Sequence, residues 1–178
     1  MSLDADEPRV LYEGHYLALV ARGRWEYATR TVKRPAVAIV AITDDRKVVL
    51  VEQYRIPVGC NVVEIPAGLT GDVEGAEDEA LLVAAQRELL EETGYEADRW
   101  TELGFSYSSP GLTDESLMIF LAEGLRRVHG GGGDASENIQ VHEVPLDAAV
   151  EWGRQRSAVV DLKLLAGLQL AKLQLDSR

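Results

Sequence analysis

The chain of 178 residues carries 18 basic and 30 acidic side chains, which gives a formal net charge of −12. Its length fits one domain with at most a small appendage, and its acidity argues against a general binder of nucleic acid or anionic membranes. An apolar run of about 18 residues and a signal-peptide pattern are both missing, and the lone Cys60 excludes an internal disulfide, so we expect a cytoplasmic protein.

The first elements in chain order are short strands. Residues 9–33 alternate apolar and polar side chains, which predicts two or three antiparallel strands. Glu13-Gly14 and Arg22-Gly23 are the expected turns between them. We therefore divide the chain into an N-terminal β segment, residues 1–34, and a main domain, residues 35–178.

The main domain mixes strands and helices. The apolar run 36–43 predicts a strand buried on both faces. Four consecutive glycines, Gly130–Gly133, predict a flexible loop. Further strands are expected at 48–54, 62–65, 100–107, 116–122 and 139–144, and helices at 76–93, 146–156 and 159–175. This order predicts an α/β fold, an α/β/α sandwich with a mixed β-sheet.

The helix expected at 76–93 carries an unusual stripe of carboxylates. Glu88, Glu91 and Glu92 are spaced i, i+3 and i+4, so they share one helix face, and Gly94 is a natural stop just after them. The apolar residues expected on another arc of the same helix are Leu82, Val83, Leu89 and Leu90.

Two interpretations of the stripe are open. Glutamates on a helix usually do no more than solvate an exposed face. Here, however, Glu88 and Glu92 repel each other by a few tenths of a kcal/mol, and no lysine balances them at i+4. The upstream stretch Glu64–Gly68 can add backbone carbonyls, so the alternative is a site for a hard cation such as Mg²⁺ or Mn²⁺.

Residues 87–95, Arg-Glu-Leu-Leu-Glu-Glu-Thr-Gly-Tyr, resemble the core of the Nudix box at every specified position. The box also requires a glutamate eight positions before its arginine, and Glu79 satisfies this. The chain departs from the pattern at position 73, where the box has glycine and this sequence has Val73. Gly68 is the expected equivalent, which lengthens the loop Thr70–Asp78 and leaves Glu74 and Glu77 as alternatives to Glu79.

The resemblance implies hydrolysis of a nucleoside diphosphate linked to another group, with Mg²⁺ or Mn²⁺ held on this helix. It implies Glu88 and Glu92 as direct metal ligands and Glu91 as a ligand directly or through water. The carbonyl of Ala67 would complete the ligand set. Arg87 would pair with Glu79 or Glu91 and orient them.

Pro110 stands sixteen positions after Gly94, and a proline at this offset resembles the mark of the ADP-ribose pyrophosphatase subfamily. Ser-Pro-Gly is also simply a good turn. The stretches Val51–Arg55, Glu64–Leu69 and Gly111–Glu115 strengthen the resemblance, which covers roughly residues 9–175. It implies cleavage of ADP-ribose to AMP and ribose 5-phosphate. Other substrates remain open, namely GDP-mannose, ADP-glucose or a dinucleoside polyphosphate, as does a non-catalytic nucleotide-sensing module.

The same subfamily implies a homodimer whose N-terminal segments help to build the purine site. Tyr16 and Trp25 could stack on the purine, and Glu26 could accept from the adenine amino group, from the partner subunit. Packing of Tyr16 and Trp25 on a small sheet is the alternative. Arg30 and Arg55 are candidate contacts to the pyrophosphate, with solvated surface arginine as the alternative.

A catalytic base is expected on a mobile loop before the last strand. Glu137, after the glycine run, is the best match to that position, and Glu115 is the second candidate. An exposed glutamate with no chemical role is the alternative for both. The three histidines have no paired spacing that suggests a metal site.

Overall fold

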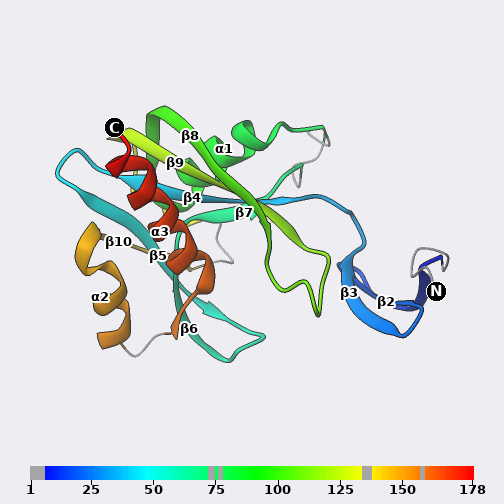
Figure 1. Ribbon diagram of the computed structural model, residues 1–178. Helices are drawn as coiled ribbons and strands as arrows, with labels where there is room; N and C mark the ends of the chain where they lie inside the picture. Colours follow the sequence, from blue (N-terminus) through cyan, green and yellow to red (C-terminus); the bar gives the residue numbers. More distant parts are fainter. Residues whose placement is uncertain (1–6, 72–74, 76–77, 134–137, 157–158) are drawn as a thin grey trace.

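A computed structural model describes residues 7–71, 75, 78–133, 138–156 and 159–178 (Figure 1). A small antiparallel sheet comes first, with its strands in the order β1 (Arg9–Glu13), β2 (Leu17–Arg22) and β3 (Trp25–Arg30). Both predicted turns lie where these strands connect. In Figure 1 this sheet stands to one side of the rest of the chain.

The main sheet has eight strands and is mixed. Its strands are β4 (Ala36–Ile42), β5 (Lys47–Arg55), β6 (Cys60–Glu64), β7 (Ala67–Leu69), β8 (Tyr95–Tyr107), β9 (Ser116–Arg127), β10 (Gln140–Pro145) and β11 (Val159–Val160). The path runs β11-β6-β5-β4-β9-β8, with β10 paired to β5 and β7 paired to β4. The β4–β9 and β11–β6 pairs are parallel, and the others are antiparallel.

Helices cover both faces of this sheet. Helix α1 (Leu81–Thr93) packs on one face, and α2 (Ala149–Gln155) and α3 (Leu162–Asp176) pack on the other, with a short 3₁₀ turn at Leu146–Ala148 leading into α2. The apolar side chains therefore form two clusters, one on each side. The predicted α/β/α sandwich with a mixed sheet and an added N-terminal sheet is confirmed.

Strand β4 explains why the sequence shows one uninterrupted apolar run. Ile39 and Val37 point into the cluster under α1, whereas Val40 and Ala38 point into the cluster under α3, and all four are fully buried. Alternating side chains of a strand face opposite sides, so a strand covered on both sides must be apolar at every position.

Helix α1 differs from its prediction in two respects. It begins at Leu81, because Ala80 has an extended conformation with φ −67° and ψ 145°. Residues 76–77 of the predicted range lie outside the described part of the chain. The prediction that Leu82 and Val83 share an inward arc is wrong, since these side chains are 39% and 52% exposed. The helix instead packs through Ala84, Ala85 and Leu89, because small side chains let its backbone approach the sheet.

Two short strands depart from the sequence-based prediction. Ala67–Leu69, which lies outside the strand expected at 62–65, is itself strand β7 and pairs with Ala36–Ala38 of β4. Val159 and Val160, expected in a helix, form β11 and pair in parallel with Val62 and Val63. Both segments are strands because their backbone groups pair with a neighbouring strand. The pattern of side chains in the sequence does not reveal such pairing.

The N-terminal sheet leaves much apolar surface uncovered. Every residue of β1 is exposed, and Leu17 and Tyr12 are 51% and 69% exposed. Leu19 between them is 40% exposed. Such a contiguous apolar face is unusual on a monomer. Among the described residues, no helix is long and apolar enough to cross a membrane.

Candidate active site

The end of α1 fixes where its carboxylates lie. Gly94 adopts the left-handed conformation with φ 75°, and its N–H donates to the Leu90 carbonyl oxygen at 2.8 Å. A side chain at this position would also collide with the His129 carbonyl, because an added Cβ would stand 2.2 Å from its oxygen. Glycine therefore ends the helix directly after the carboxylates, as predicted.

Two of the carboxylates are buried against the loop that carries Ala67 and Gly68. Glu88 and Glu92 are only 7% and 4% exposed. The Ala67 N–H donates to Glu92 Oε2 at 3.0 Å, and a Cβ on Gly68 would lie 2.0 Å from the Glu88 carboxylate. A larger residue at 68 would displace the Glu88 carboxylate, so glycine here lets that carboxylate lie against the loop.

Arg87 neutralises the carboxylates around it. Its guanidinium donates to both oxygens of Glu79 at 3.1 Å, to Glu88 at 2.8 Å and to Glu91 at 3.1 Å. It also donates to the Leu69 carbonyl oxygen at 3.0 Å. Arginine suits this position because its planar fork presents five donors in fixed directions. The sequence left the pairing open between Glu79 and Glu91, and the structure makes both contacts.

Glu79 belongs to this network although it precedes the helix. Its side chain is 6% exposed and also accepts from the Gly71 N–H at 3.0 Å. The Arg87 guanidinium holds the pKa of Glu79 below its ordinary value, against the opposing effect of burial. The alternatives Glu74 and Glu77 lie outside the described residues.

The chemistry of these donors fits a hard divalent cation. Glu88, Glu91 and Glu92 present only oxygens, and the backbone of 67–68 lies directly against two of them. Within the described residues, no group of three or more His, Cys, Asp or Glu is already arranged to hold a metal ion. Arg87 forms ion pairs with Glu88 and Glu91 in this arrangement.

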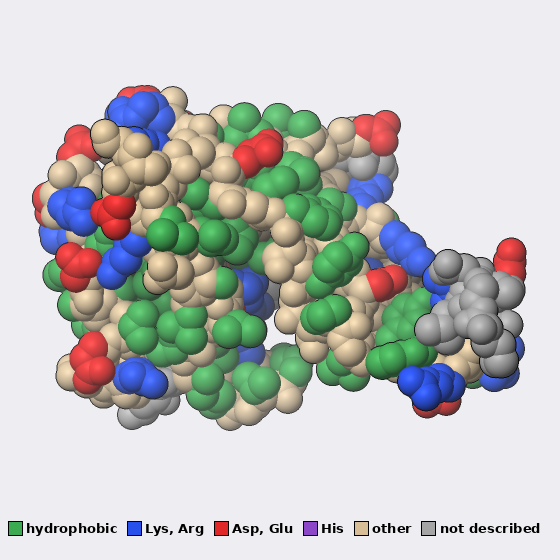
Figure 2. Space-filling model, viewed as in Figure 1, with side chains coloured by type: hydrophobic (Ala, Val, Ile, Leu, Met, Phe, Trp, Pro, Cys, Tyr) green, Lys and Arg blue, Asp and Glu red, His purple; other side chains and the backbone are tan. Residues whose placement is uncertain are grey.

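A cavity of about 1080 Å³ opens beside the helix. It brings together predicted residues from distant parts of the sequence, namely Arg30, Arg55, Ala67, Glu88 and Glu115. Figure 2 shows a hollow on this face with basic side chains in its depth. Carboxylates able to hold a cation and arginines able to hold an anion thus line one space, which is the arrangement that binding a metal-bound diphosphate requires.

Glu115, the second candidate for a base, is engaged by an arginine. Arg30 donates to Glu115 Oε1 through Nη2 at 2.5 Å and through Nε at 3.1 Å. The neighbouring Asp114 accepts from Thr29 Oγ1 at 2.9 Å. These contacts tie the β8–β9 connection to β3, so the N-terminal sheet holds the rim of the cavity.

The sequence missed two residues of this cavity. The sequence suggests only a backbone carbonyl of the stretch Glu64–Gly68 as a ligand. The Glu64 side chain is nevertheless part of the cavity wall, since Glu64 is 2% exposed and accepts from Arg55 Nε at 2.6 Å. Lys163 was not considered, although its Nζ lies 3.1 Å from the other Glu64 oxygen. The available signal was Asp161 two positions before Lys163, a residue type typical of a helix start.

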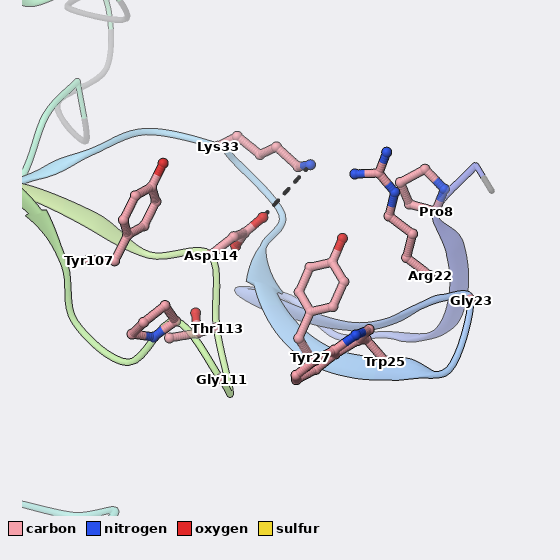
Figure 3. Close-up of a pocket in the computed structure, with 11 residues that line it drawn as sticks. Pro8, Arg22, Gly23, Trp25, Tyr27, Lys33, Tyr107, Gly111, Thr113 and Asp114 are labelled. Carbon is pink, nitrogen blue, oxygen red and sulfur yellow. Dashed lines mark ion pairs between the residues drawn. The ribbon is translucent and has the colours of Figure 1, made fainter. Parts of the chain in front are cut away.

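A second cavity, of about 620 Å³, lies between β3 and the β8–β9 connection (Figure 3). Trp25 and Tyr27 line it from β3, Tyr107 lines it from the end of β8, and Pro110 and Gly111 line it from the connection. Its aromatic walls suit a flat apolar ring such as a nucleobase. Trp25, 51% exposed, is thus available for the predicted stacking.

Tyr16 and Trp25 cannot hold the same base within one chain. Tyr16 lies opposite Thr31, whose N–H donates to the Tyr16 carbonyl oxygen at 3.1 Å, whereas Trp25 pairs with Arg22 at the other end of the hairpin. At about 3.3 Å per residue the two backbone positions lie roughly 20 Å apart along the hairpin. Glu26, next to Trp25, faces the opposite side of the strand. A sandwich between these rings therefore requires two chains.

The glycine run is not simply flexible. Gly131 to Gly133 have φ values of 70°, 115° and 68°, and the N–H groups of Gly132 and Gly133 donate to the Glu92 and Glu91 carbonyl oxygens at 2.7 and 3.1 Å. These three residues dock on the end of α1, a contact that the sequence does not predict, and the mobility of the run stays a prediction. Glu137, the first candidate for a base, lies outside the described residues.

Gly131→Ala should lower the thermal midpoint by about 5 °C or more, since a left-handed alanine costs about 1–2 kcal/mol and its contacts add to this. An added Cβ would stand 2.4 Å from the Thr93 carbonyl carbon. Gly130→Ala is the matched control, because a Cβ there meets nothing within 4 Å. Calorimetry of both variants decides the matter, and equal midpoints would show that the segment is not docked.

The fold and the site together define a class. A mixed sheet between helices, with a glutamate-rich helix end at a cavity lined by arginines, is the arrangement of a hydrolase that acts on diphosphate compounds. Residues 32–164 match the family model described as NUDIX domain. The chain belongs to this family, and it is a Nudix hydrolase. Nudix hydrolases generally need a divalent metal.

Relatives extend this finding over most of the chain. It is 40% identical over 145 residues to the ADP-ribose pyrophosphatase of Bacillus subtilis, covering 80% of this chain and 75% of the relative. It is 39% identical, with the same coverage, to the methanol dehydrogenase activator of Bacillus methanolicus. A solved structure of an ADP compounds hydrolase has a TM-score of 0.75 at 21% identity, covers 99% of this chain and 97% of its own, and supports the fold.

Proposed function

We propose that this protein hydrolyses the diphosphate bond of ADP-ribose to AMP and ribose 5-phosphate. The observation that carries the proposal is the shared cavity, in which Glu88 lies with Arg30 and Arg55. The chain also resembles the ADP-ribose pyrophosphatase of Bacillus subtilis over 80% of its length. GDP-mannose is the leading alternative, because the GDP-mannose pyrophosphatase of Escherichia coli is 34% identical over 61% of the chain.

Each residue of the candidate site has a distinct role in this proposal. Mg²⁺, with Mn²⁺ as a substitute, would be held by Glu88, Glu92, Glu91 and the Ala67 carbonyl, and would neutralise phosphate charge and acidify a bound water. Arg55 and Arg30 bind the diphosphate oxygens, since guanidinium donors match their geometry. Arg87 and Glu79 orient the carboxylates.

The proton acceptor in this scheme is a glutamate. We assign Glu137 to this role, because it follows a segment docked on the metal-binding helix, and Glu115 remains the second candidate. Replacing each with Gln separates them. The assignment fails if Glu137→Gln keeps wild-type kcat while Glu115→Gln loses it.

The purine site in this proposal is built by two chains. Trp25 supplies one aromatic face, and Tyr16 and Glu26 act from the partner subunit, since one chain cannot bring these residues to the same base. The uncovered apolar face of the N-terminal sheet, with Leu17 and Leu19, supports a homodimer. Sedimentation equilibrium at micromolar concentration tests this, and a monomer mass would overturn it.

The substrate assignment is tested with a panel of compounds. Purified protein with Mg²⁺ is given ADP-ribose, ADP-glucose, GDP-mannose and a dinucleoside polyphosphate, and the products are separated by chromatography. We expect AMP and ribose 5-phosphate from ADP-ribose with the highest kcat/KM. If another compound is turned over faster, that compound replaces ADP-ribose as the proposed substrate. If the protein binds these compounds but hydrolyses none of them, it is a nucleotide-sensing module.

Trp25→Ala should raise KM for ADP-ribose about ten-fold while kcat changes little, since stacking on a base contributes about 1–3 kcal/mol in ground and transition states alike. Tyr54→Ala is a suitable control, because Tyr54 is an aromatic residue of similar exposure, 58%, on β5. Steady-state kinetics of both variants provide the measurement. An unchanged KM in Trp25→Ala would mean that Trp25 does not bind the base and only packs on the small sheet.

A further inference from the structure

One buried carboxylate connects two cations on the wall of the larger cavity. Glu64 is 2% exposed, and its two oxygens accept from Arg55 Nε at 2.6 Å and from Lys163 Nζ at 3.1 Å. Arg55 comes from β5, and Lys163 comes from the first turn of α3. Residues 108 positions apart in the sequence are thereby fixed beside each other.

The backbone around Lys163 is held as firmly as its side chain. Asp161 accepts from the Lys163 N–H at 2.6 Å and forms an ion pair with Lys163 Nζ at 3.0 Å. The Asp161 N–H in turn donates to the Val63 carbonyl oxygen at 3.0 Å, directly after β11 pairs with β6. Lys163 is therefore placed by the sheet and not by an exposed loop.

The Arg55 and Lys163 side chains are accessible from the cavity, whereas the Glu64 carboxylate behind them is buried. The side chains of Arg55 and Lys163 are 42% and 27% exposed, against 3% for Glu64. A lysine ammonium has three N–H donors, and Glu64 and Asp161 accept two of them. Among the described residues, contacts to Arg55 engage its Nε, which leaves its Nη donors for a ligand.

The charges of this wall are stable and face the metal-binding helix. Burial opposes the charge of Lys163, but Glu64 and Asp161 raise its pKa above the ordinary value. Burial likewise opposes the charge of Arg55, whose pKa is raised by Glu64 and, at longer range, by Glu92. Glu88 of α1 lines the same cavity as both cations, so this wall and the carboxylate-bearing helix share one space. Both cations persist at neutral pH.

We infer that Lys163 is a further substrate-binding residue, which donates to the diphosphate from the wall opposite the metal-binding helix together with Arg55. The inference rests on the proposed function, since it assigns a diphosphate to this cavity. A purely structural role for Lys163, neutralising the buried Glu64, is the competing account. The two accounts differ once the charge of Glu64 is removed.

The experiment measures KM and kcat for ADP-ribose with Mg²⁺ in four variants. Lys163→Met should raise KM about ten- to one-hundred-fold with little change in kcat, as expected for the loss of one charge-assisted hydrogen bond. Lys163→Arg should stay within about three-fold of wild type, since it keeps the charge. Lys172→Met is the matched control on the same helix, because Lys172 pairs with exposed Asp147 far from the cavity.

The double variant Glu64→Gln/Lys163→Met separates the two accounts. If Lys163 contacts the diphosphate, KM stays raised in the double variant, and if Lys163 only neutralises Glu64, KM returns toward wild type and the inference is overturned. Wild-type KM in Lys163→Met also overturns it. Should Lys163→Met fail to fold, the double variant, which has no unpaired buried charge, gives the answer.

Failure of the proposed function has a different signature from failure of this inference. If the wild-type protein does not hydrolyse ADP-ribose, the proposed substrate is wrong. The variants are then compared on whichever diphosphate compound the wild type cleaves.

Discussion

Glu92→Gln should lower kcat for the preferred diphosphate substrate roughly 10³-fold, about 4 kcal/mol of transition-state stabilisation. Glu92 is buried at the end of α1, and Gln removes its negative charge while keeping an oxygen for the Ala67 N–H, 3.0 Å away. The fold should therefore survive. Stopped assays of the phosphate-ester products measure kcat, and the circular dichroism spectrum shows whether the fold survives.

Glu102→Gln is the control for this substitution. Glu102 is an exposed residue of β8 that lines none of the described cavities, so its loss should leave kcat within about two-fold of wild type. Wild-type turnover by Glu92→Gln would refute the assignment of this carboxylate to the metal. Loss of secondary structure would instead assign it to the fold.

Arg87→Met should lower the free energy of unfolding by about 2–4 kcal/mol, because it leaves partly buried carboxylates without their cation. Glu79 and Glu88 lose their contacts at 3.1 and 2.8 Å. The exposed pair of Arg126 with Glu96 supplies the control, and Arg126→Met should cost less than about 1 kcal/mol. Urea unfolding followed by fluorescence gives both values, and equal losses would mean that the Arg87 network is no stronger than a surface pair.

The same variant should also change how stability depends on pH. In the folded protein the pKa of Glu79 lies below its ordinary value of 4.5, because of Arg87. A depressed carboxyl pKa stabilises the fold above the unfolded-state pKa, and this stabilisation is lost as pH falls through the folded-state pKa. Wild-type stability should thus fall between about pH 6 and pH 3, and Arg87→Met should fall less steeply over that range. If the stability of the wild type and of Arg87→Met falls in parallel with pH, the Arg87–Glu79 contact is not the source of the pH dependence.

The parts of the fold that local chemistry determines could be predicted from the sequence. Gly94 ends helix α1, the run 36–43 is buried on both faces, and Gly68 lies directly against the Glu88 carboxylate. Each rests on one strong local constraint, such as a left-handed residue, a fully apolar strand or a close approach. Such constraints act on the residues that carry them, so a single sequence reveals them.

Contacts between distant segments could not be predicted in the same way. The join of Glu64 to Lys163 depends on β11 pairing with β6, and two valines at 159–160 do not distinguish a strand from the start of a helix. The docking of Gly131–Gly133 on α1 depends on the backbone of a distant helix, whereas glycine composition alone indicates mobility. Both misses concern backbone hydrogen bonds made across the fold.

Arg87 also bears on whether this chain folds before or after it binds a metal ion. Proteins whose clustered ligands carry uncompensated charge often fold only as their ion arrives. Here an arginine of the same helix already pairs with Glu88 and Glu91 and reduces the repulsion between them, so the polypeptide is expected to reach its native shape first and to load its ion afterwards. An ion held by these carboxylates would displace the Arg87 contacts, so removing the ion with a chelator should abolish activity reversibly without unfolding the protein, as equal circular dichroism spectra before and after chelation would show.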